Sequence, residues 1–323
     1  MRARCRGFAP LALIVFLGAH AALAEDRDPD FTAVARAGAR PRECGGAARE
    51  TPTRWDRAKV PALGPYCAAL ARGYASLRTL PRGALDAAAL AERLLPGRAA
   101  PSILSGRARV ALGEFAGAWD AFEHARALSR KEMEVPGALH DLAIAALRTG
   151  HQEAALDAYV ALAPRAALLD DPREEVRVLV EVGVLSMSLG PEHLSEAIAF
   201  LTEARRRAKS FGASDFVQGA LSLADSRDGR LAEAAAVAEE ASGPWRLEAE
   251  REGTRTALAD RPELPEGELD AIIAALAEGR DRELALSRWQ SYLESRAGKS
   301  SPFAAHARAR RDAMRGHKSG AAR

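Results

Sequence analysis

One pattern recurs along the chain: an apolar stretch with helical spacing, a short turn, and a second apolar stretch with helical spacing. The turn falls at Gly113, Gly150, Gly190 and Gly229, and Thr79 takes the place of the glycine in an earlier copy. Successive turns are separated by 34, 37, 40 and 39 residues. A pair of helices of this size cannot cover its own apolar face, so neighbouring pairs have to stack. The pattern predicts a row of stacked helical hairpins.

The same position in each copy carries a small residue. Where two helices cross closely, side-chain bulk sets the distance between them, and the predicted second helix of every copy has an alanine at this place. The five alanines are Ala84, Ala118, Ala155, Ala197 and Ala234. The first helices are predicted over 66–77, 101–112, 138–149, 176–189 and 216–227. The abundance of Ala, Leu, Arg and Glu, with only 5% aromatic residues, favours helix over strand. The sequence therefore predicts an all-α fold.

Paired large and small residues in the first helices resemble those of a known family. The pairs are Leu142-Ala143, Val182-Gly183 and Leu221-Ser222. With the turns and the alanines, they resemble the tetratricopeptide repeat (TPR) family, whose unit has 34 residues. The resemblance covers roughly residues 65–242 and implies a right-handed α-solenoid of TPR-like hairpins. Ser105-Gly106 departs from the pair and the later units are longer, which leaves a related helical-hairpin solenoid open.

The rest of the chain is divided by composition. We expect a signal peptide over 1–24, a mostly irregular extension over 25–64, about five repeats over 65–242, and a disordered tail over 316–323. Between the repeats and the tail, the segment 243–315 is expected to hold a charged linker helix (245–260), a degenerate hairpin with Trp289 and Tyr292, and a final helix beginning at Ser301-Pro302. A terminal unit with a more polar outer face stops a solenoid from stacking further.

The first 24 residues are typical of a secretory signal. Arg2, Arg4 and Arg6 precede the apolar run Leu11 to Ala19, and Ala22-Leu23-Ala24 forms a small-x-small cleavage site before Glu25. The alternative is a membrane anchor, but the apolar run is about half of the ~20 residues that span a bilayer. We expect cleavage after Ala24 and a soluble periplasmic or secreted protein. The alanine and arginine bias favours a bacterial source.

Export would leave two cysteines, Cys44 and Cys67, in the mature chain. An oxidising compartment favours a disulfide between them, which on the chain-entropy model is worth roughly 3 kcal/mol. It would join the Gly/Pro/Arg-rich segment 38–64 to the first helix. The alternative is a pair of free buried thiols.

The sequence contains no recognised catalytic or cofactor-binding motif. Gly298-Lys299-Ser300 resembles the end of a phosphate-binding loop, but Leu293 stands where the upstream glycine is needed, so we interpret this stretch as a linker. The nucleophile-elbow and zinc-protease motifs are absent too. The histidines are scattered, and no cofactor or metal is expected. We expect a binding protein and not an enzyme; the alternative is a hydrolase whose site is assembled across repeats.

The family geometry implies a concave face lined by the first helices, and this face is the expected partner-binding groove. Its predicted residues are Arg107, His140, Ile144, Leu147, Arg148, Arg177, Val180, Val184, Met187, Leu223 and Arg227. Arginines along an apolar strip favour a protein or peptide partner of acidic character. The predicted function is an interaction scaffold of the cell envelope.

A basic C-terminus suggests an alternative function. From Arg296 to the end there are eight Lys or Arg residues against one Asp. These include Arg308, Arg310, Arg311, Arg315, Lys318 and Arg323. In the alternative, this basic end docks a structural component on an anionic envelope surface. Nucleic acid is not expected, because no aromatic residues are interleaved to stack on bases. The oligomeric state is left open.

Overall fold

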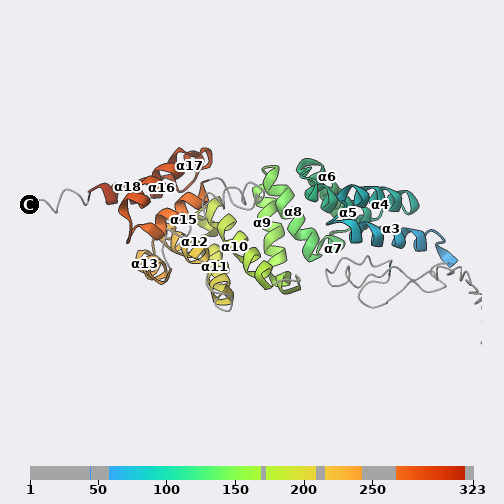
Figure 1. Ribbon diagram of the computed structural model, residues 1–323, viewed down its shortest axis with the longest axis horizontal. Helices are drawn as coiled ribbons and strands as arrows, with labels where there is room; N and C mark the ends of the chain where they lie inside the picture. Colours follow the sequence, from blue (N-terminus) through green and yellow to red (C-terminus); the bar gives the residue numbers. More distant parts are fainter. Residues whose placement is uncertain (1–43, 45–57, 169–171, 209–214, 242–266, 317–323) are drawn as a thin grey trace, which may run out of the picture.

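The computed structural model describes residue 44 and residues 58–168, 172–208, 215–241 and 267–316. Within these residues the fold is all-α, without strands, which confirms the predicted fold class. Figure 1 shows the helices following one another along the long axis of the molecule, from α3 and α4 at one end to α16–α18 at the other. Consecutive helices pack against each other. The chain is therefore a helical-repeat solenoid.

Within the described residues, six helical pairs make up the array. Their first helices are α3 (Leu63–Ser76), α5 (Ala99–Ala111), α8 (Pro136–Arg148), α10 (Pro172–Leu189), α12 (Asp215–Arg227) and α15 (Glu268–Ala277). Their second helices are α4 (Pro81–Leu94), α6 (Phe115–Leu128), α9 (Gln152–Leu162), α11 (Leu194–Ala208), α13 (Leu231–Glu240) and α16 (Arg282–Glu294). Shorter helices and the last helix are α7 (Arg130–Met133), η2 (Ala163–Leu168), η3 (Pro191–His193), α17 (Arg296–Ser300) and α18 (Ala304–Gly316).

Most of the predicted turns depend on glycine. Gly113, Gly150 and Gly229 have φ of +75°, +83° and +82°, a left-handed conformation that costs glycine little because it has no Cβ. Gly190, at the longer turn, is instead extended with φ of 169°. The two extra residues of this turn form part of η3, so the chain reverses without a left-handed residue.

Small residues at the helix crossings let the pairs approach closely. The five equivalent alanines of the second helices are all buried, with at most 6% exposure. A Cβ on Gly106 of α5 would lie 2.7 Å from the ring of Phe122 in α6, and one on Gly183 of α10 would lie 2.5 Å from Leu201 in α11. Gly106 therefore still serves as the small residue of its pair, although Ser105 replaces the large one.

The sixth pair does not continue the stack in the same way. At the four earlier junctions the second helix of one pair packs on the first helix of the next, for example α4 on α5 and α11 on α12. At the last junction α15 packs mainly on α12 and hardly on α13. Gly219 of α12 permits this approach, since a Cβ there would lie 2.7 Å from Ile272 of α15. Together with α10, α11 and α13, α15 buries every residue of α12 from Val217 to Arg227.

Two other expectations concern the ends of the array. Gly298-Lys299-Ser300 is not a linker but lies in the short helix α17, where the Ser295 side chain accepts a hydrogen bond from the Gly298 N–H. The last helix, predicted over 302–315, is α18. The predicted signal peptide, most of the extension, the linker helix 245–260 and the tail beyond Gly316 lie outside the described residues.

At the N-terminal end, Cys44 and Cys67 form a disulfide, one of the two alternatives left open by the sequence. Their Cα atoms are 5.6 Å apart, and both residues are buried. The bond joins residue 44 to α3. Among the helices that the structure describes, none is both long and apolar enough to cross a membrane.

Candidate interaction surface

Polar side chains from successive first helices meet in a line, which we call the first-helix seam: Tyr74, Arg107, His140, Asp141, Arg177 and Glu181. Arg107 of α5 donates a hydrogen bond from Nε to Asp141 Oδ2 of α8 over 2.7 Å. On its other side, the Arg107 guanidinium lies 6.0 Å from the ring centre of Tyr74 in α3. The seam therefore joins three successive pairs.

His140 extends the seam to the fourth pair. Its Nε2 lies 3.4 Å from Nη2 of Arg177 and 3.9 Å from Oε2 of Glu181, both in α10. Arg177 in turn lies 3.4 Å from Glu181, one helical turn away. Side chains that follow one another at about one repeat length thus form a continuous chain of polar contacts across α3, α5, α8 and α10.

Local sequence makes room for these contacts. Gly137 stands in the first turn of α8, where a Cβ would lie 2.7 Å from Nη2 of Arg107. A larger residue there would push the guanidinium away from Asp141. The side chains of Arg107, His140 and Asp141 are each 17% exposed and that of Arg177 is 28% exposed. The seam is half-buried, with one edge in solvent.

The charged groups of the seam shift the pKa values of His140 and Asp141. Burial disfavours the charged imidazole of His140, but the carboxylates of Asp141 and Glu181 outweigh burial and the charge of Arg177, so the pKa of His140 is raised. Burial favours a neutral Asp141, but Arg107 and His140 outweigh it and hold the pKa of Asp141 below its usual value. Both shifts favour the ionised network.

Several predicted groove residues do not face solvent, and this part of the prediction is wrong. Ile144, Val180, Val184, Met187, Leu223 and Arg227 are buried. All but Ile144 and Arg227 belong to one hydrophobic cluster with Ile272 and Tyr292 of the last pair. For Leu223 and Arg227, the physical reason is that α15 packs on α12 and covers the side where the groove was expected to continue. Ile144 on α8 and the residues of α10 are instead buried among the neighbouring helical pairs. Arg107, His140, Leu147, Arg148 and Arg177 keep some exposure.

Sequence reasoning missed the acidic members of the seam. Asp141 and Glu181 each lie nine residues before their turn glycines, Gly150 and Gly190, so they occupy the same place in their units. That shared offset was the available signal. These two carboxylates also change the expected character of the groove. Arg107 and Arg177 are paired with carboxylates and are not unpaired cations on an apolar strip.

Arg148 is the most exposed of the predicted groove arginines. Its guanidinium lies 4.5 Å from the ring centre of Phe115 in α6. Close by in sequence, the His151 ring stacks on Trp119 of α6 at 4.4 Å. These contacts place a cation and two aromatic rings at the edge of the α6–α8 junction.

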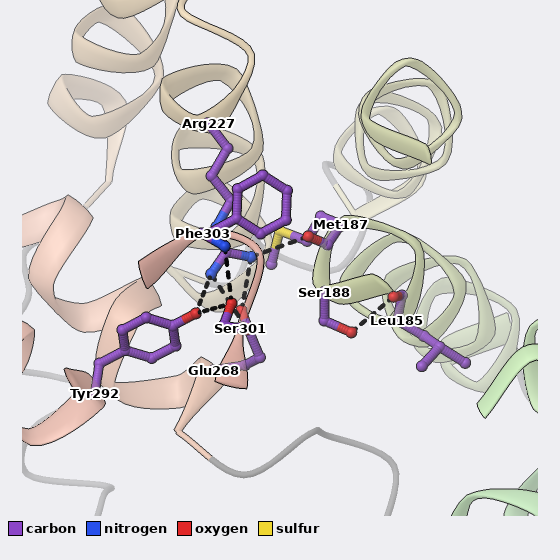
Figure 2. Close-up of polar contacts among 8 residues, drawn as sticks. All are labelled: Leu185, Met187, Ser188, Arg227, Glu268, Tyr292, Ser301 and Phe303. Carbon is purple, nitrogen blue, oxygen red and sulfur yellow. Dashed lines mark hydrogen bonds and ion pairs between the residues drawn. The ribbon is translucent and has the colours of Figure 1, made fainter. Parts of the chain in front are cut away.

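Arg227 is the centre of a second polar cluster, which Figure 2 shows between α10, α12 and the last pair. Its guanidinium donates to Glu268 Oε2 at 2.9 Å and Oε1 at 3.2 Å, and to the Met187 carbonyl oxygen at 3.1 Å. It also donates to the Tyr292 hydroxyl at 3.3 Å, and it lies 4.4 Å from the ring centre of Phe303. The Arg227 side chain has 0% exposure. This cluster holds the last pair against α12, and its guanidinium is not accessible to a partner.

The arginines of α18 are partly used within the molecule. Arg310 binds the Glu278 carboxylate, which also accepts a hydrogen bond from Trp289 Nε1 at 2.8 Å. Arg311 donates to Gln290 Oε1 at 3.0 Å. Arg308 and Arg315 are exposed. The basic face of this helix is therefore narrower than its sequence indicates.

The described residues contain no group of three or more His, Cys, Asp or Glu side chains able to hold a metal ion. His306 is half-buried beside Ser226, whose Oγ lies 3.0 Å from its Nε2, and beside Trp289. Burial, with the charges of Arg227 and Arg310, lowers the pKa of His306 to about 4.

No protein-family model matches this chain, and no curated protein matches it. Conclusions about what the chain does therefore rest on its own residues.

Proposed function

We propose that this chain is an exported, TPR-like scaffold that binds another protein through the first-helix face of α3, α5, α8 and α10. The supporting observation is the first-helix seam, in which partly exposed polar residues recur at about one repeat length. An extended peptide matches such a surface, because its own repeat of side chains and amides runs along several helical pairs.

The chemistry of the face favours a partner segment with acidic residues. Arg148 is exposed, and its only described contact is with the ring of Phe115. It has no carboxylate partner among the described residues, so it is available to bind a carboxylate of the partner. Arg107 uses Nε for Asp141, and a guanidinium carries five N–H donors, so the ion pair does not exhaust it. Leu147 adds apolar area beside Arg148.

Export is the second part of the proposal. The disulfide between Cys44 and Cys67 supports it, because such bonds persist in oxidising compartments and are rare in the cytosol. The predicted signal peptide over 1–24 is the route, with cleavage after Ala24.

The test is affinity capture from envelope extracts with the mature chain as bait. The face variant carries Arg148→Glu and Arg177→Glu, and the matched control carries Arg308→Glu and Arg315→Glu on α18. We expect the proteins enriched by the wild type to be lost with the face variant and kept with the control. Circular dichroism and thermal unfolding check that both variants fold.

The same two variants, in a membrane co-sedimentation assay, test the alternative of docking on an anionic surface through the C-terminus. In that case the control variant would lose membrane co-sedimentation and the face variant would keep it. Truncation after Ser295 is less suitable, because it removes Phe303, His306 and Arg310, which stabilise the last pair. Identical captured proteins for all three baits would contradict the proposed function.

A further inference from the structure

The changed position of the last pair leaves a cavity between α13 and the C-terminal helices. Its volume is about 610 Å³. It is bounded by α12, α13, the end of α15, the start of α16, and α18. We propose that this cavity binds an amphiphilic carboxylate, a molecule with one aliphatic chain and one acidic head. The proposal is independent of the first-helix face and stands if that face proves inactive.

The cavity exists because α13 lacks its usual neighbour. In the earlier pairs the second helix packs on the next first helix, whereas α15 packs on α12. Among the described residues no first helix packs on the corresponding side of α13, where Ala235 is exposed and Leu231 is 49% exposed. An open apolar helix flank of this kind is stabilised when a ligand covers it.

The walls are suited to an aliphatic chain. Half of the lining residues have small or aliphatic apolar side chains: Leu231, Ala234, Ala235, Ala238, Ala275, Leu276, Ala313 and Met314. Alanines leave width between the helices without adding polar groups. The volume lies within the range of small-molecule sites, about 300–1,000 Å³. The cavity can therefore take a chain that bulk water solvates poorly.

The charged groups at the cavity are mostly arginines. Arg310 forms an ion pair with Glu278, so the other charged groups that line the cavity are two arginines, Arg280 and Arg282, and one carboxylate, Glu239. Arg280 donates to the carbonyl oxygens of Ala241 and Glu239.

Arg282 is bound in a similar way. It donates to the carbonyl oxygens of Met314 and Arg315. Among the described contacts, neither Arg280 nor Arg282 has a carboxylate partner, and Arg282 Nε is buried without a hydrogen bond. Guanidinium groups bound only to neutral acceptors are strong sites for an added carboxylate.

Dodecanoate is the probe, and its binding to the full mature chain is measured by isothermal titration calorimetry below its micelle concentration. We expect saturable binding of one molecule per chain, and weaker binding of the neutral dodecanol. Ala235→Phe fills the cavity and should abolish binding. Ala236→Phe, on the neighbouring exposed position that does not line the cavity, is the matched control and should bind as the wild type does.

The head-group contact is tested separately. Arg280→Gln should weaken dodecanoate binding by about tenfold or more and leave dodecanol unchanged, while Arg308→Gln on α18 should change neither. Unfolding curves of all variants establish that they are folded. Absence of saturable binding, equal affinity for dodecanol, or full binding by a folded Ala235→Phe variant would overturn the proposal.

Discussion

Two arginines at the same place in their units differ completely in environment. Arg148 and Arg227 each stand two residues before a left-handed turn glycine, Gly150 and Gly229. Arg148 is exposed and lies over the ring of Phe115, whereas Arg227 is buried on Glu268 and Phe303. What differs is the next helical pair, which leaves the first-helix side open at α8 and covers it at α12.

The comparison shows that the repeat determines the direction of a side chain relative to its helix, but not which residues surround that side chain. In the N-terminal region, polar residues of the first helices form a half-buried seam with one edge in solvent. In the C-terminal region, α15 turns the same side of the array into core, and an arginine there needs a carboxylate and other polar partners. The proposed partner-binding surface and the buried cluster that holds the last pair thus use the same repeating position.

Removing Arg227 should have the largest effect. Arg227→Met leaves the Glu268 carboxylate buried without its partner, which we expect to cost about 3–5 kcal/mol of unfolding free energy. Arg148→Met should cost less than about 1 kcal/mol, because an exposed contact contributes little. Urea unfolding followed by circular dichroism measures both. The double variant Arg227→Met with Glu268→Met should recover part of the loss. Equal effects of the two single variants would show that α15 does not make the two positions different.

Breaking the disulfide should have the next largest effect, confined to the N-terminal end. Cys67→Ser removes the link to residue 44 and should cost roughly 3 kcal/mol on the chain-entropy model. Hydrogen exchange should rise in α3 and α4 and stay unchanged in α15 and α16, where Trp289 reports the local fold. Cys44→Ser should match it. Increased exchange across the whole chain would mean that the two regions unfold as one unit.

Acidification should act in opposite directions on the two regions. The pKa of His306 is lowered to about 4, so the unfolded chain binds a proton near pH 6.5 that the folded chain does not. As the pH falls from 6.5 towards 4, the C-terminal region should lose stability, on the order of 2–3 kcal/mol. His306→Asn should remove this dependence.

The N-terminal region should respond the other way and more weakly. Because the pKa of His140 is raised, its contribution is complete below about pH 6.5 and is lost as the pH rises through the raised value. Hydrogen exchange of α8 and α18 at pH 7.5 and pH 5 measures the two responses together. A parallel change in both helices would contradict the opposite shifts.

The helical pairs themselves were predictable from local patterns. Apolar spacing, the turn glycines and the equivalent alanines each depend on neighbours within one unit, so they locate the helices without knowledge of the fold. The seam was only half predictable. Arg107, His140 and Arg177 were identified, but Asp141 and Glu181 were not, because an ion pair between units depends on how far one pair is rotated against the next.

What the sequence determined by itself is therefore the repeating unit: the helix type, the turns, and the small residues at each crossing. Those features follow from short-range chain geometry, which every copy shares. Only the tertiary structure decided that α15 packs on α12, that Arg227 is buried while Arg148 is exposed, and that a cavity opens beside α13. These outcomes depend on which surfaces are buried against each other at long range, as between Gly219 and Ile272, and no local pattern encodes that choice.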